Sequence, residues 1–135
     1  AFEKFKEIKG LDFLEVENCS FFKYGEHSGA SPDGLVSDNS VLEIKCPKST
    51  TFFELVATNE IDKKYFAQMQ HQMLCSNREK AYFFNYLIHD GTEYYHTIEV
   101  DRCEKTIELI KERLDEVIKI KLEYINLINN NKQWK

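Results

Sequence analysis

The sequence predicts an α/β (α+β) domain in which a mixed, mainly antiparallel central sheet is flanked by helices. Strand-forming residues surround turn signals in residues 31–47 and again in residues 80–100. Apolar residues recur at helical spacing in residues 62–75 and 101–129. Because 135 residues is the length of one domain with a proper core, we expect a single domain spanning residues 1–135.

The first third of the chain predicts a helix followed by short strands. Residues 1–9 carry apolar side chains at helical spacing, and Gly10 is a suitable stop. Residues 11–24 predict one or two strands with a turn near Glu17-Asn18, and residues 25–30 predict a flexible loop. The chain begins without Met and within this helix, so we expect an upstream N-terminal segment to be missing from it.

The remainder predicts helices on either side of an aromatic hairpin. In chain order, we expect a short helix over 49–58, a second helix over 62–75, an aromatic strand over 80–88, a hairpin turn over 89–92, a partner strand over 93–100 and a long helix over 101–129 capped by Asp101. An apolar stripe on the long helix predicts packing against the domain or a contact with another subunit: Ile107, Ile110, Leu114, Val117, Ile118 and Ile125. We expect Trp134 to seal the core or to dock on another subunit.

The stretch most informative about chemistry is Ser31-Pro32-Asp33-Gly34-Leu35 followed by Leu42-Glu43-Ile44-Lys45-Cys46-Pro47. A hairpin folded about Asp38 would place Asp33 opposite Glu43. Glu43 and Lys45 are two residues apart, so on a strand they point to the same face. The sequence thus predicts two carboxylates and one ammonium on one small patch.

This patch suits metal-dependent cleavage of a phosphodiester. Two neighbouring carboxylates are hard ligands for Mg²⁺ or Mn²⁺ and leave room for water and a phosphate oxygen. A bound cation lowers the pKa of its water, and Lys45 can hold that water or stabilise charge on the phosphorus oxygens. Taken singly, however, Ser-Pro-Asp-Gly is usually a turn and Glu-x-Lys is usually a solvated pair on an outer strand.

The composition narrows the possible functions. The net charge of −5 does not favour strong non-specific DNA binding by this chain. The cysteines at 19, 46, 75 and 103 form no CxxC, which argues against an iron–sulfur nuclease and favours reduced, buried thiols. No apolar run is long enough for a transmembrane helix and no signal peptide is visible, so we expect a cytoplasmic protein.

The two stretches above, together with Tyr65-Phe66-Ala67-Gln68-Met69-Gln70, closely resemble the lambda exonuclease and YqaJ-like viral recombinase family of PD-(D/E)xK nucleases. Residues 81–86 and 133–135 also look like that family, so the resemblance covers nearly the whole chain. It implies a restriction-endonuclease-like core in a protein encoded by a bacterium, phage or prophage. It further implies a Mg²⁺-dependent 5′→3′ exonuclease that acts on duplex DNA ends and leaves 3′ single strands for recombination.

The resemblance also assigns roles to individual residues. It implies that Asp33, Glu43 and the backbone carbonyl of Ile44 hold the metal ion, and that Lys45 completes the catalytic set. For the substrate it implies contacts from Ser31, Tyr65 and Gln68, with Gln70 as the alternative because the two glutamines do not share a helix face. Without the resemblance, the sequence would predict that Tyr65 is a core residue and that the two glutamines are solvated.

Three functions therefore stay open at the level of the sequence. The first is the exonuclease, for which the resemblance implies a homotrimeric ring around DNA and a single-strand annealing protein as partner. The second is an endonuclease of the same fold, since one fold hosts many specificities. The third is a non-catalytic domain that binds DNA or a protein, although the presence of Asp33, Glu43 and Lys45 argues against it.

Overall fold

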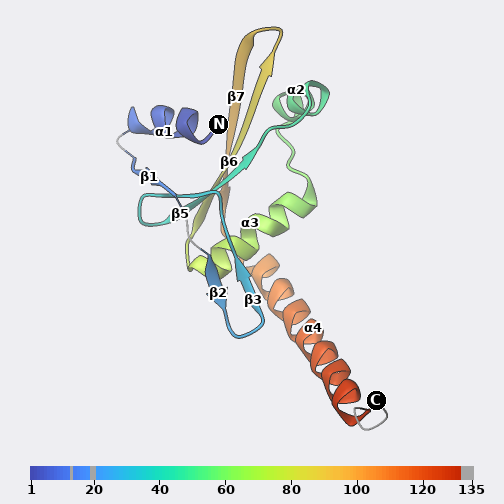
Figure 1. Cartoon of the computed structure of the whole chain (residues 1–135). Helices are drawn as coiled ribbons and strands as arrows, with labels where there is room; N and C mark the ends of the chain where they lie inside the picture. The colour runs from blue at the N-terminus through green and yellow to red at the C-terminus, as the bar shows by residue number, and fades with distance from the viewer. Residues whose placement is uncertain (13, 19–20, 132–135) are drawn as a thin grey trace.

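The computed structural model describes residues 1–12, 14–18 and 21–131. Within these residues the chain forms short strands near the N-terminus, a long hairpin in the second half and helices between and after them (Figure 1). The elements are α1 (Phe2–Gly10), β1 (Val16–Glu17), β2 (Phe22–Tyr24), β3 (Ser28–Ala30), β4 (Gly34–Val36), β5 (Ser40–Lys45), α2 (Ser49–Thr58), α3 (Lys63–Ser76), β6 (Lys80–His89), β7 (Thr92–Asp101) and α4 (Glu104–Asn130).

The main sheet has five strands in the order β1-β4-β5-β6-β7. Its pairings are antiparallel except for β5 with β6, which are parallel and are connected through α2 and α3. The predicted mixed, mainly antiparallel sheet is therefore confirmed. The strands β2 and β3 form a separate two-stranded antiparallel sheet.

Helices cover both faces of the main sheet, and the alternation of β5 decides which side chains face which helix. Leu42 belongs to a buried cluster with Phe5 of α1. Val41 belongs to a second buried cluster with Leu55 of α2 and Met69 of α3. Glu43 and Lys45 follow Val41 by two and four residues, so their side chains point to the same side of the strand as Val41. They therefore lie on the sheet face that α2 and α3 cover.

Several local predictions are confirmed at the level of single residues. The short helix spans Ser49–Thr58, as expected. Asp62 caps α3 by accepting a hydrogen bond from the backbone N–H of Lys64 at 2.9 Å. The hairpin between β6 and β7 turns at Asp90 and Gly91, whose φ angles are both positive, as a two-residue type I′ turn requires.

Two boundary predictions were wrong. Residues 28–30 form β3 and pair with β2 rather than belonging to a flexible loop, because the small side chains allow close strand pairing. Asp101 does not cap the long helix: it is the last residue of β7 and pairs with Lys80, and the cap of α4 is Cys103. Pairing along the whole hairpin thus extends the strand to Asp101, the residue that was expected to cap the helix.

The long helix packs less than its apolar stripe predicts. Figure 1 shows α4 extending away from the sheet. Within the apolar stripe, Ile107 is buried, while Val117 and Ile125 are exposed. The N-terminal half of α4 borders α3, where Ile110 and Leu114 lie beside Ala67 and His71. Trp134 lies outside the described residues.

Gly34 is required where β4 begins. A Cβ atom at this position would lie 2.9 Å from the ring of Phe2, 3.1 Å from the carbonyl oxygen of Glu17 and 3.2 Å from Leu42. We therefore expect Gly34→Ala to destabilise the protein by about 1–3 kcal/mol, the usual range for overpacking. Urea unfolding measures this, and Gly10→Ala is the control because nothing lies within 4 Å of a Cβ there. Equal stability of both variants would contradict the expected clash.

Candidate active site

The β4–β5 hairpin brings Asp33 and Glu43 together as the sequence predicts. Gly34 pairs with Leu42, so the preceding residue, Asp33, lies opposite Glu43. The backbone N–H of Asp33 donates to the carbonyl of Leu42 at 2.9 Å. The backbone N–H of Ile44 donates to Oδ2 of Asp33 at 2.7 Å. This second bond fixes the Asp33 carboxylate beside the strand that carries Glu43.

Glu43 is a buried carboxylate with a partner on each oxygen. Only 4 % of the residue is exposed. Its Oε1 lies 3.0 Å from Nζ of Lys45, and its Oε2 accepts a hydrogen bond from Nε2 of Gln72 at 2.7 Å. A buried charge of this kind is tolerated because it is paired and hydrogen-bonded. The two partners also leave Glu43 little freedom to turn.

Lys45 is held between Glu43 and Tyr65. Its Nζ lies 4.5 Å from the centroid of the Tyr65 ring, in addition to its contact with Glu43. The ring of Tyr65 in turn lies 5.8 Å from that of Phe83 on β6. An ammonium above an aromatic face is attracted by the ring quadrupole. Tyr65 thus contacts Lys45 directly, beside the Glu43 carboxylate.

Gln72 donates a hydrogen bond to Glu43 but was not predicted from the sequence to be a site residue. It lies on α3 and is buried. A sequence signal existed, because Gln72 follows Gln68 by four residues and Tyr65 by seven and so shares a helix face with both. The exposed Gln68 lies one turn before Gln72 on this face. Gln68 thus extends the same surface toward solvent.

The predicted substrate residues fall into different environments. Ser31 is exposed, two residues before Asp33. Gln70 is fully buried, and its Nε2 donates to the carbonyl of Asp101 at 3.0 Å while its Oε1 accepts from the N–H of Cys103 at 2.8 Å. Both ends of the Gln70 amide therefore join α3 to the start of α4. This position argues against Gln70 as a substrate contact and favours a structural role.

The donor set at the site fits a hard divalent cation. Asp33 and Glu43 supply carboxylate oxygens, and Ile44, whose backbone N–H binds Asp33, directly follows Glu43 in the chain. No cluster of three His, Cys, Asp or Glu side chains suited to a metal occurs among the residues that the structure describes, so the backbone carbonyl of Ile44 would be needed. Oε1 of Gln72 is buried beside Glu43 without a hydrogen-bond partner in the described chain. The waters that Mg²⁺ retains would supply the missing donor.

A second polar cluster joins α3 to the small sheet. Nε2 of His71 lies 3.1 Å from Oγ of Ser28 and 3.5 Å from Sγ of Cys75. Burial lowers the pKa of His71 and raises the pKa of Cys75, so both side chains are neutral near pH 7. We regard this cluster as structural, since neither group is charged.

The cysteine prediction holds only in part. Cys46, Cys75 and Cys103 are free thiols. Cys75 and Cys103 are partly buried, but Cys46 is exposed and was wrongly expected to be buried. It follows Lys45 at the end of β5, where the strand leaves the sheet. Cys19 lies outside the described residues.

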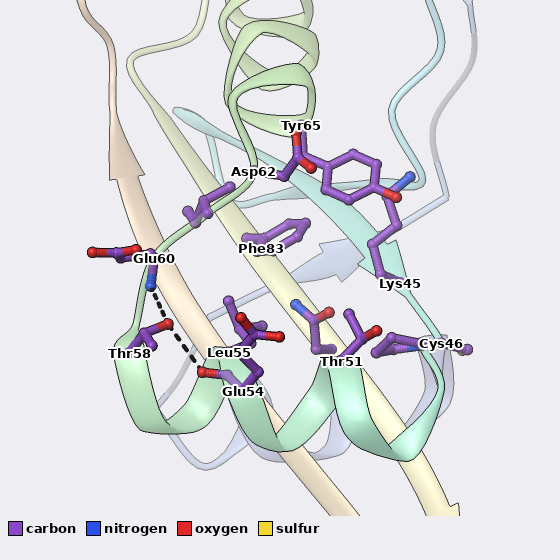
Figure 2. A pocket seen from close by; sticks show the side chains of 13 residues that line it. Lys45, Cys46, Thr51, Glu54, Leu55, Thr58, Glu60, Asp62, Tyr65 and Phe83 are labelled. Carbon is purple, nitrogen blue, oxygen red and sulfur yellow. Dashed lines mark hydrogen bonds between the residues drawn. The ribbon is translucent and has the colours of Figure 1, made fainter.

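Beside Lys45, a pocket opens between α2, the loop that follows it and β6 (Figure 2). Its volume is about 480 Å³, within the range of roughly 300–1,000 Å³ that is common for small-molecule sites. It is lined by Lys45, Cys46, Pro47, Thr51, Glu54, Leu55, Thr58, Glu60, Ile61, Asp62, Tyr65, Phe83 and Asn85. The catalytic lysine candidate and Tyr65 therefore form part of its wall.

These features define a class of protein. A mixed sheet presents Pro32-Asp33 and Glu43-Ile44-Lys45 from neighbouring strands, and α3 covers the same face. This is the arrangement of the PD-(D/E)xK nucleases. Residues 1–79 match the sequence model of the YqaJ-like viral recombinase domain, and the chain belongs to that family.

Solved structures agree with this assignment. The chain is similar to the alkaline exonuclease LHK-Exo of Laribacter hongkongensis, with a TM-score of 0.83 and 26% identity over 99% of this chain and 72% of that one. LHK-Exo in complex with dAMP gives a TM-score of 0.74 and 27% identity over 92% and 68% of the two chains. The chain is therefore a nuclease of the viral recombinase family.

A third solved structure supports the fold alone, and the curated protein sequences offer no relative. A phage-related exonuclease from Haemophilus somnus 129PT shares the fold, with a TM-score of 0.58 and 15% identity over 84% of this chain and 63% of that one. Among curated protein sequences, no significant match was found. Within the described part of the chain, no helix combines the length and hydropathy needed to cross a bilayer.

Proposed function

We propose that this chain is the nuclease domain of a metal-dependent exonuclease that digests linear duplex DNA from its 5′ ends. The product would be a 3′ single-stranded overhang for homologous recombination. The observation that carries the proposal is the buried Glu43 paired with Lys45 opposite Asp33 on one hairpin. Similarity to LHK-Exo supports an exonuclease rather than an endonuclease.

Each site residue has a distinct part in the proposed reaction. Asp33, Glu43 and the carbonyl of Ile44 would bind Mg²⁺ or Mn²⁺, which when bound stabilises the charge of the scissile phosphate and activates a water. Lys45 would hold that water or stabilise charge on the phosphorus oxygens. Tyr65 keeps the ammonium of Lys45 in place.

The substrate contacts that we propose are Gln68 and Ser31. Gln68 is exposed on the same face of α3 as Tyr65, one helical turn before Gln72, which donates to the buried carboxylate of Glu43. Ser31 is exposed just before Asp33 and would face a phosphate at the hairpin. A homotrimeric ring and a single-strand annealing partner are further proposals that rest on the family resemblance alone, and light scattering after gel filtration tests the first.

Gln72→Leu is expected to lower both the metal affinity and the cleavage rate by about 10- to 100-fold, because partners behind the ligands orient them. Loss of the amide leaves Oε2 of Glu43 without the bond from Gln72. Gln68→Leu should instead raise KM for DNA with little effect on metal affinity. Isothermal titration with Mn²⁺ and steady-state cleavage separate the two variants, and unchanged metal affinity in Gln72→Leu would contradict the role.

The polarity of cleavage is tested with linear duplex DNA labelled at one 5′ end and with covalently closed circular DNA. With Mg²⁺, we expect loss of the 5′ label as mononucleotide from linear DNA and no change in the circle. Nicking or cutting of the circle would point to an endonuclease of the same fold. Loss from the 3′ end first would contradict the proposed direction.

A further inference from the structure

One arginine joins the turn of the β4–β5 hairpin to the segment between α3 and β6. Nη1 of Arg78 donates to the backbone carbonyl of Ser37 at 2.8 Å and to that of Ser40 at 3.0 Å. Ser37 directly follows β4, and Ser40 is the first residue of β5. The guanidinium of Arg78 therefore holds the end of one hairpin strand against the start of the next.

The β4 side of this hairpin has little other support. Ser37 has a φ angle of 50°, in the left-handed region that costs a residue with a Cβ atom free energy. β5 pairs with β6 along its whole length, whereas β4 spans only Gly34–Val36 and its other neighbour, β1, is shorter still. Short strands with few partners open easily. The strand that follows Asp33 is thus the part of the hairpin most dependent on the turn.

Arg78 is itself fixed by the end of α3. Its backbone N–H donates to the carbonyl of Met73 at 3.0 Å, and its own carbonyl accepts from Nη1 of Arg102 at 3.2 Å. The same helix carries Gln72, which donates to Oε2 of Glu43. The main chain of Arg78 is therefore held by the helix that reaches one carboxylate of the site, while its side chain holds the hairpin that carries both.

We propose that Arg78 is a positioning residue for the candidate metal site. By holding the turn, it keeps the Asp33 carboxylate where it accepts from the N–H of Ile44 and lies opposite Glu43. Glu43 is three residues beyond Ser40, about 10 Å along a strand, so Arg78 acts through the backbone and not on the metal ion. This role rests on the proposed function and deepens it, because it adds a residue that sets the geometry of the ligands.

The amide of Ile44 reports the position of Asp33 without a cleavage assay. Its N–H donates to Oδ2 of Asp33 at 2.7 Å, and NMR measures its hydrogen exchange. Arg78→Met removes the donors and keeps a long side chain, while Arg78→Lys keeps a charged donor. We expect exchange at Ile44 to be about tenfold faster in Arg78→Met, as loss of one hydrogen bond implies, and near the wild-type rate in Arg78→Lys. Amides in the middle of β6 measure global opening.

Metal binding measures the consequence for the site. We expect Arg78→Met to weaken Mn²⁺ binding about tenfold, at the lower end of the range for residues that orient metal ligands. Its kcat for duplex DNA should fall while KM for DNA is unchanged, and a higher Mn²⁺ concentration should recover the rate. Arg78→Lys should bind Mn²⁺ as the wild type does. Wild-type Mn²⁺ affinity and Ile44 exchange in a folded Arg78→Met variant would overturn the positioning role.

Arg102→Met is the matched control. Nη1 of Arg102 also donates to two backbone carbonyls, those of Met73 and Arg78, and neither carbonyl lies in the β4–β5 hairpin. We expect this variant to be less stable in urea but to keep the wild-type Mn²⁺ affinity and the wild-type exchange of Ile44 relative to β6. Equal effects of Arg78→Met and Arg102→Met on both quantities would show general destabilisation and overturn the proposal. Should Arg78→Met fail to fold, Arg78→Gln takes its place with the same expected direction.

The two proposals fail in different ways. A wild-type protein that neither bound Mn²⁺ nor cleaved DNA would end the proposed function, while the exchange of Ile44 would still decide whether Arg78 positions Asp33. A wild-type nuclease whose Arg78→Met variant matched it in Ile44 exchange and Mn²⁺ affinity would overturn the positioning role alone.

Discussion

Lys45→Ala is expected to reduce the rate of DNA cleavage by at least about 100- to 1,000-fold while the fold is retained. Removal of one group that stabilises developing charge commonly costs this much. The side chain ends β5 at the pocket, where its Nζ contacts Glu43 and the ring of Tyr65. Release of acid-soluble nucleotides from linear duplex DNA measures the rate, and circular dichroism with thermal unfolding measures the fold.

The sheet offers a matched control for this substitution. Lys80 begins β6, and its Nζ lies 3.6 Å from Oε2 of Glu99 on the neighbouring strand. Lys80→Ala thus removes a lysine paired with a glutamate on the same sheet, away from Asp33 and Glu43. We expect its cleavage rate to equal that of the wild type. Full activity of Lys45→Ala, or an equal loss in both variants, would contradict the assigned role.

Glu43→Gln is expected to abolish metal binding and to lower cleavage as strongly as Lys45→Ala does. The substitution keeps the size of the side chain but removes the charge that would bind the cation and that pairs with Lys45. Asp33→Asn tests the other predicted carboxylate, which is exposed and therefore easier to change without disturbing the core. Titration with Mn²⁺ followed by electron paramagnetic resonance measures the number of bound ions.

Two controls show whether a loss of Mn²⁺ binding in Glu43→Gln is specific to the loss of a metal ligand. Glu99→Gln changes the glutamate of the control pair and should leave Mn²⁺ binding intact. Calorimetric unfolding reports whether the buried position of Glu43 tolerates the amide. Wild-type Mn²⁺ affinity in a folded Glu43→Gln variant would rule out Glu43 as a ligand.

The sequence carried enough information to predict the hairpin chemistry. The separation between Asp33 and Glu43, with a turn between them, determines that they lie opposite each other, and the structure has this register. The same two-residue period places Lys45 with Glu43, which the 3.0 Å contact confirms. Local periodicity is sufficient here because the hairpin is made of neighbouring residues.

Long-range contacts were harder to predict. Gln72 reaches Glu43 only because α3 crosses the face of β5, and helix periodicity cannot tell which of several polar residues meets the sheet. The burial of Gln70 depends in the same way on where β7 ends and α4 begins. The exposed C-terminal half of α4 has an amphipathic pattern, but that pattern does not say what the helix contacts.

The central claim is that Asp33, Glu43 and Lys45 form a metal-dependent nuclease site. Its most direct test is the release of mononucleotides from linear duplex DNA by the wild-type protein, measured with Mg²⁺, after addition of EDTA and after Mg²⁺ is restored. We predict rapid release that stops with EDTA and returns with the metal, and no release at any stage by Glu43→Gln. Cleavage that persists in EDTA, or that is unaffected by Glu43→Gln, would contradict the claim.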